Sequence, residues 1–131
     1  MAQANLANAG TSIETNKDSI VIVDNFQSIR GGRTLDVTGF APAIINAGHI
    51  IIRETATGEL KPMPVASGAF DALPTGHTYH GILINTIQTA KPMAGILVRG
   101  TVNPSAMPYT VSSILAALKT ALPLIDFRAD A

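Results

Sequence analysis

The 131-residue sequence contains no cysteine. This absence excludes disulfide bonds, a thiolate nucleophile and a zinc site built on cysteine ligands. Aromatic residues make up only 5% of the chain and charged residues 14%, whereas 47% of the residues are hydrophobic. A chain of this length buries roughly 65–70% of the surface that its unfolded form exposes, so one substantial core is expected. The composition therefore predicts a single domain with little charge on its surface.

Neither sign of charge is in excess, because 9 lysines and arginines balance 9 aspartates and glutamates. Phosphate groups of nucleic acids or lipids are bound by clustered basic side chains. The nearest approach to such a cluster is the pair Arg30 and Arg33, separated by two glycines. We therefore expect no nucleic-acid partner.

Long hydrophobic runs are also missing. A bilayer-spanning helix needs roughly 20 apolar residues, and the most apolar run, Ile44–Ile52, is interrupted by Asn46, Gly48 and His49. The N-terminal residues show neither the basic start nor the apolar stretch of a secretory signal. No membrane partner is expected, and the protein should be soluble where it is made.

The chain divides into an arm and one domain. Residues 1–19 are small and polar, with only Leu6 and Ile13 as sizeable apolar side chains. Such a segment buries too little surface to offset its ordering entropy, so we expect a flexible arm. It is either a frayed end without a role or an arm that orders against a neighbouring subunit. Residues 20–131 are expected to form the domain.

Short apolar runs predict a mostly β domain. Ile20–Val23 is interpreted as a first buried strand, and the glycine pair at positions 31 and 32 as a turn. Residues 34–38 alternate, which is typical of a half-exposed strand.

A hairpin is expected in the middle of the chain. Residues 49–53 form an apolar strand, with His49 at its start as an edge residue whose polar atoms are satisfied. The following segment turns at Gly58 and resumes as an extended arm. Because Pro62 and Pro64 have no N–H to donate, this arm should lie at the edge of the sheet.

Residues 80–109 form the centre of the expected fold. Residues 82–87 and 96–102 are rich in β-branched side chains and predict two paired strands joined by a loop. Gly95 and Gly100 are interpreted as points where backbones approach closely. Four side chains are expected in the core, namely Ile82, Ile84, Ile96 and Val98. Arg99 and Asn103 are expected to mark an outward or subunit-facing edge.

The period then changes to that of a helix. Val111, Leu115, Leu118 and Leu122 are spaced 4, 3 and 4 residues apart, which places them on one helical face. Thr110 or Ser112 is expected to cap the helix, Pro123 to end it, and residues 124–128 to be extended. Residues 66–76 are interpreted as a loop, with Phe70 and Leu73 closing the core. The fold class is therefore α+β, mostly β, with a small mixed sheet or barrel and one C-terminal helix.

No catalytic constellation stands out. The H-x-x-H pair formed by His77 and His80 lacks further ligands at metal-binding spacing, so polar loop or core histidines are favoured over a metal site. There is no Gly-x-Ser-x-Gly elbow, phosphate-binding loop or pair of acids at a plausible spacing. We expect no enzyme, cofactor, metal or small-molecule substrate, and a structural or binding role remains.

Four segments together resemble the lambda-type bacteriophage head decoration proteins. These segments are Asn46-Ala47-Gly48-His49-Ile50-Ile51, Thr57-Gly58-Glu59-Leu60-Lys61-Pro62-Met63, Gly81-Ile82-Leu83-Ile84, and Ala94-Gly95-Ile96-Leu97-Val98-Arg99-Gly100-Thr101-Val102-Asn103. The likeness covers about residues 44–128. Residues 28–40 and 66–79 depart from the family pattern.

The resemblance implies a β-tulip-like fold and a homotrimer bound to the outside of an icosahedral phage head. Such a protein cements neighbouring capsomers of the major capsid protein, and its flexible N-terminal arm adds to a capsid sheet. It would be made in the host cytoplasm and end in the virion. The residues expected at capsid or subunit interfaces are Leu6, Ile13, Ile20, Arg30, Arg33, Arg99 and Asn103.

Two alternatives stay open. The chain could be the capsid-anchoring base of a head fibre, in which case a partner chain would carry the receptor-binding part. It could also be a small histidine-dependent metal enzyme that uses His77 and His80.

Overall fold

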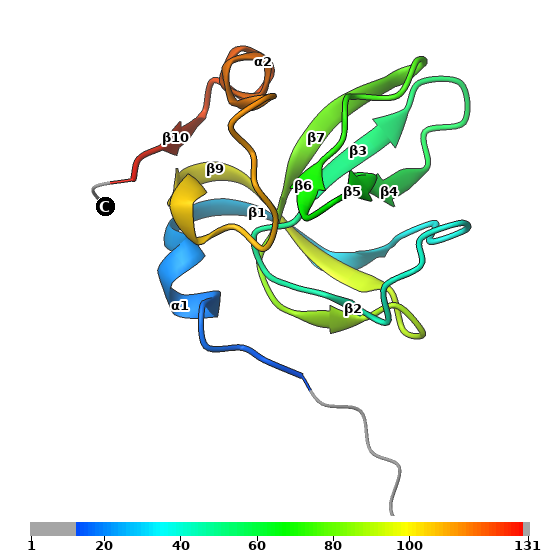
Figure 1. Cartoon of the computed structure of the whole chain (residues 1–131), viewed down its shortest axis with the longest axis horizontal. Coiled ribbons are helices and arrows are strands. Elements are labelled where there is room, and N and C mark those ends of the chain that lie inside the picture. The colour runs from blue at the N-terminus through cyan, green and yellow to red at the C-terminus, as the bar shows by residue number, and fades with distance from the viewer. Residues whose placement is uncertain (1–12, 130–131) are drawn as a thin grey trace, which may run out of the picture.

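The structure is a computed structural model that describes residues 13–129, without the side chains of residues 30 and 31. Two short helices, a 3₁₀ turn and ten strands follow one another along the chain (Figure 1). In order they are α1 (Asp18–Val21), β1 (Ile22–Thr34), β2 (Ile44–Ile45), β3 (Ile50–Glu54), β4 (Leu60–Pro62), β5 (Val65–Ala66), β6 (Ala69–Phe70), β7 (His77–Leu83), β8 (Ile87–Gln88), β9 (Met93–Val102), η1 (Pro104–Ala106), α2 (Leu115–Ala121) and β10 (Ile125–Phe127). The predicted fold class, α+β and mostly β with a C-terminal helix, is confirmed.

One six-stranded sheet organises the domain. Its strand order is β1-β9-β7-β3-β4, and β10 pairs in parallel with β9 at residues 100–102. The predicted pairing within residues 80–109 is confirmed, because Ile82 and Leu83 of β7 lie opposite Leu97 and Ile96 of β9. β9 therefore joins the long strand β1 to the rest of the sheet. The first of the two predicted strands is misplaced, however, because β7 ends at Leu83 and does not continue to residue 87.

The middle of the chain forms the predicted hairpin. Arg53 of β3 pairs with Leu60 of β4, and Gly58 in the turn adopts φ +77°, a left-handed conformation that glycine accommodates without strain. β4 ends the strand order, so the expectation that the proline-containing arm lies at an edge is also confirmed.

The central strands of the sheet are buried on both faces. In β3, Ile50 and Ile52 pack into a cluster with α2 and η1, whereas Ile51 packs on the opposite side with Leu83 and Ile96. The β5–β6 hairpin joins the first cluster through Phe70, and the strands β2 and β8 join the second. A strand that is buried on both faces needs apolar residues at consecutive positions, which explains the continuous apolar runs.

This double burial corrects the predicted core. Ile82 and Ile96 are fully buried as expected, but Ile84 and Val98 are only half-buried. Their places are taken by Leu83 and Leu97, which are also fully buried. The prediction assumed one buried face, and the second layer formed by residues 35–45 and β8 was not apparent from alternation.

The first predicted strand is wrong. Residues 18–21 form the helix α1, and β1 begins only at Ile22. Val21 is fully buried, but Ile20 is 50% exposed. Asp18 holds this turn against the domain, because its carboxylate accepts a hydrogen bond of 2.8 Å from the Thr86 hydroxyl.

Three local predictions also fail. The glycine pair at 31 and 32 does not form a turn that ends the strand, because β1 runs through it. Gly32 nevertheless has a positive φ of 71°, within the register shift between Ile29 and Arg33. Residues 35–38 are not a strand, although Leu35 is buried. Residues 66–76 contain all of the β5–β6 hairpin except Val65, rather than only a loop.

The C-terminal helix has the predicted apolar face. Leu118 is fully buried, Val111 is buried, and Leu115 and Leu122 pack against the core. The helix begins later than expected, with Ile114 at the N-cap and no side-chain cap. Neither Thr110 nor Ser112 therefore serves as the cap.

Candidate interaction surface

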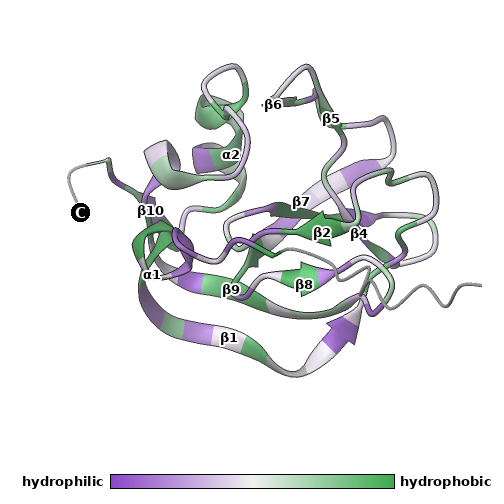
Figure 2. Cartoon of the chain, turned by 60° about the horizontal axis from the view of Figure 1, so that its bottom comes forward, coloured by the Kyte–Doolittle hydropathy of each residue, from purple (hydrophilic) through white to green (hydrophobic). Residues whose placement is uncertain are grey.

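The outer edge of β1 is a long strand edge without a strand partner in the described chain. β1 pairs with β9 along one side, and no other described strand pairs with its second side. Figure 2 shows β1 along one margin of the molecule, with β9 as its neighbour. An edge strand presents unpaired N–H and C=O groups that can accept a further strand.

The side chains of this edge are equally open. Residues 23–27 are all exposed, and Phe26, at 72% exposure, is the most exposed large apolar side chain of the described chain. Val23 on the same strand and Ile20 in α1 are also exposed. Natural edge strands are often protected by charged side chains, proline or β-bulges. β1 has neither lysine nor proline, although it carries Asp24 and has register shifts between Ile22 and Ser28.

β1 lies very close to β9 near its first residues. A Cβ atom at Gly100 would overlap the carbonyl oxygen of Asp24, so only glycine allows this approach. The predicted role of Gly100 as a point of close backbone approach is therefore confirmed, whereas Gly95 has ordinary spacing around it. Register shifts between Ile22 and Ser28 bend the strand in the same region. The edge is held in place by its inner partner while its outer side stays open.

The structure separates the predicted interface residues. Ile13, Ile20, Arg33 and Arg99 have exposed side chains, and Arg99 lies opposite Gln27 in the pairing of β9 with β1. Leu6 and the side chain of Arg30 lie outside the described residues.

Asn103 is a correction, because it is buried rather than outward-facing. Its Oδ1 atom accepts a hydrogen bond of 3.0 Å from Ser105 N and so caps η1. The prediction placed Asn103 at an outward edge, but a side chain that caps a turn can be buried because its polar group is satisfied. The exposed residues that sequence reasoning missed are Val23 and Phe26, which apolarity had assigned to the interior or left unplaced.

His49 is the most buried polar side chain of the described chain, at 0% exposure. Its Nε2 atom lies 2.9 Å from the Met63 carbonyl oxygen, and its ring meets those of Phe40, Phe70 and Tyr109 edge to face at centroid distances of 5.1–5.7 Å. The Nδ1 atom has no hydrogen-bond partner among residues 13–129 and the side chain is fully buried, so the expectation of a satisfied edge histidine is wrong. Burial lowers the pKa of His49 to about 4, and the bond to Met63 opposes this shift only in part.

The two other histidines do not share a site. His77 lines a hollow beside Asp36 and Lys61, whereas His80 lines another beside Arg33 and Arg53. No group of three potential metal-ligating side chains occurs within residues 13–129. The geometry therefore gives no support to the metal-enzyme alternative.

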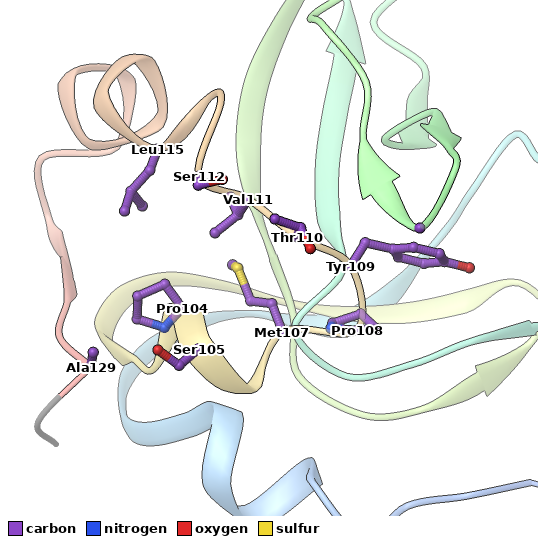
Figure 3. A pocket seen from close by; sticks show the side chains of 11 residues that line it. Pro104, Ser105, Met107, Pro108, Tyr109, Thr110, Val111, Ser112, Leu115 and Ala129 are labelled. Atoms are coloured by element: carbon purple, nitrogen blue, oxygen red, sulfur yellow. The ribbon is translucent and has the colours of Figure 1, made fainter.

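A further hollow of about 430 Å³ lies between η1, the segment 107–112 and α2. Figure 3 shows Met107, Val111 and Leu115 directed into the space between α2 and η1, whereas the Tyr109 ring extends away from it. The lining residues carry no charge that would select a partner.

Comparisons with known proteins identify no relative of this chain. No protein-family model matches the chain, and neither a curated protein nor a solved structure matches it significantly. Within the described part of the chain, no helix has the length and apolar character required to cross a bilayer.

Proposed function

We propose that the protein decorates the outside of a phage head and binds there through the outer edge of β1, to which an extended segment of the major capsid protein adds as a further strand. The observation that carries this proposal is the open edge of β1 with its exposed Phe26. The resemblance of residues 44–128 to lambda-type head decoration proteins gives the same class of partner.

Strand addition suits a protein with few charges and few aromatic side chains. Main-chain hydrogen bonds supply affinity without requiring special side chains, and pockets for alternate side chains supply specificity. Phe26 is the anchor in this interface, because large aromatic side chains contribute most to binding when they become buried.

Assembly as a trimer strengthens such an interface. Several weak contacts made at once raise the overall avidity by orders of magnitude without a deep pocket. A trimer at symmetric positions on the head would bridge capsomers and resist their separation. Light scattering on the purified protein tests this part, and a monomer would contradict it.

Co-sedimentation with expanded heads that lack this protein tests the binding itself. Phe26→Asp should weaken binding at least about tenfold, because a charged group would be desolvated at the centre of the interface. Leu124→Asp is the matched control, since Leu124 is also a highly exposed apolar residue but precedes β10, on the other side of β9. The proposal would be contradicted if wild-type protein did not co-sediment with the heads, or if both variants bound equally well.

A further inference from the structure

The two ends of the strand order approach each other at a cationic hollow. Ile29, Arg33 and Thr34 of β1 line it together with Arg53, Leu60 and the turn between β3 and β4, although β1 and β4 lie at opposite ends of the strand order. A hydrogen bond of 2.8 Å from Asp36 N to the Leu60 carbonyl oxygen joins the segment after β1 to β4. The sheet therefore curls, and the hollow lies at the seam between its two edges.

Three basic side chains converge on this hollow of about 450 Å³. They come from three strands: Arg33 from β1, Arg53 from β3 and His80 from β7. Glu59 is the single carboxylate among the lining residues. Neither Arg33 nor Arg53 forms an ion pair with a described residue, in contrast to Lys61, which pairs with Glu54 at 3.2 Å.

The turn beside the hollow makes room for one guanidinium group. A Cβ atom at Gly58 would lie 3.3 Å from Arg53 Nη2, so glycine leaves this space to the arginine. Burial, and then the positive charges of Arg53 and Arg33, lower the pKa of His80. Arg53 and Arg33 thus lie close enough for their charges to act on a partly buried ring.

We propose that this seam is a binding site for an acidic side chain, supplied by the capsid segment that adds to β1. Continuity with the proposed interface supports this assignment, because Arg33 belongs to β1 itself and a strand that follows its edge reaches the hollow. Charge complementarity supports it as well, since guanidinium groups bind carboxylates through paired hydrogen bonds. The identity of the partner, a capsid segment, rests on the proposed function. The acidic chemistry of the ligand follows from the residues that line the hollow and does not depend on that function.

The first test measures binding to expanded heads at increasing NaCl concentrations. Arg33→Gln and Arg53→Gln should each weaken binding about tenfold at low salt and reduce its dependence on salt, because a charge-assisted hydrogen bond is lost. Lys119→Gln removes an equal charge from the exposed side of α2 and should bind as wild type does. Both arginines are exposed, so chemical denaturation should show unchanged stability. Binding by both variants that matches wild type at every salt concentration overturns the inference.

The second test needs no heads. Acetylated tetraglutamate should shift the NMR signals of the His80 ring and raise its pKa, and the double variant Arg33→Gln/Arg53→Gln should abolish both effects. If wild-type protein does not bind heads but tetraglutamate still shifts the His80 signals, the proposed function fails and the acidic-ligand site stands. If inorganic phosphate gives the response and the peptide does not, the acidic-side-chain assignment is overturned.

Discussion

The cluster around His49 and the outer edge of β1 show opposite solutions for aromatic side chains. At His49, four rings meet edge to face inside the domain, and the histidine is completely buried. On β1, Phe26 has no such surroundings and is 72% exposed. Burial of aromatic surface contributes to stability in the first region, and the same surface in the second becomes useful only when a partner covers it.

The two regions are therefore expected to serve different purposes, because the cluster around His49 stabilises the fold and the edge of β1 binds a partner. Substitutions around His49 should lower the free energy of unfolding, whereas substitutions along β1 should change binding and leave stability almost unaffected.

Phe70→Ala should produce the largest loss. Phe70 is buried and contacts the rings of His49 and Tyr109, so its removal leaves a cavity that costs about 3–5 kcal/mol of unfolding free energy. Phe26→Ala is the matched control and should stay within about 0.5 kcal/mol of wild type. Chemical denaturation measures both, and equal losses would end the distinction between the two regions.

Acidification should destabilise the protein through His49. Its pKa is about 4 in the folded protein, below the ordinary 6.5, so the unfolded state binds a proton first as pH falls. This contribution is fully present above pH 6.5 and is lost between pH 6.5 and 4; the loss is about 2 kcal/mol at pH 5 and about 3 kcal/mol at pH 4.

His49→Phe should remove this part of the pH dependence. Hydrogen bonds lower the pKa values of Asp36 and Glu54, and their contribution, which is lost at more acidic pH, would remain in the variant. Denaturation curves of both proteins at pH 7.5, 5 and 4 measure the difference. Parallel losses in the two proteins would show that His49 is not the source.

Asn103→Ala should cost about 1 kcal/mol of stability, because Ser105 N loses its capping acceptor. The substitution should have a negligible effect on binding to heads, since Asn103 is buried inside the domain and does not lie on the outer edge of β1. Ser105→Ala is a useful control, because it keeps the backbone N–H that donates a hydrogen bond to Asn103 Oδ1. A large binding defect in Asn103→Ala at unchanged stability would return this residue to the interface.

Val23→Thr should have the smallest effect on stability, within about 0.5 kcal/mol, because the side chain is already exposed and threonine suits a strand. Its binding to heads should weaken by a few-fold if Val23 becomes buried with Phe26. Thermal denaturation and co-sedimentation measure the two quantities. A loss of stability with intact binding would place Val23 in the fold rather than in the interface.

The sequence predicted elements whose signals are local. The hairpin at Gly58 and the helical face of Leu118 follow from turn chemistry and from a 3.6-residue period, and both are confirmed. The prediction failed where long-range packing decides. Ile20–Val23 is as apolar as a buried strand, but only Val21 is fully buried, where its side chain packs against Gly48.

The candidate interface was predictable only in part. Arg33 and Arg99 are exposed charges, which polarity alone suggests. The exposure of Phe26 could not be predicted in this way, because the residue type alone does not distinguish an exposed phenylalanine from a buried one. The cationic seam was also hidden, since Arg33, Arg53 and His80 converge only when the sheet curls.

Amide hydrogen exchange on the head-bound protein tests the central claim most directly. If a capsid strand adds to the outer edge of β1, the outward amides of residues 22–28 should exchange much more slowly on heads than in free protein, while those of α2 stay unchanged. Unchanged exchange in β1, with new protection around η1 and α2 instead, would contradict the account and move the interface to the hollow lined by Met107 and Leu115.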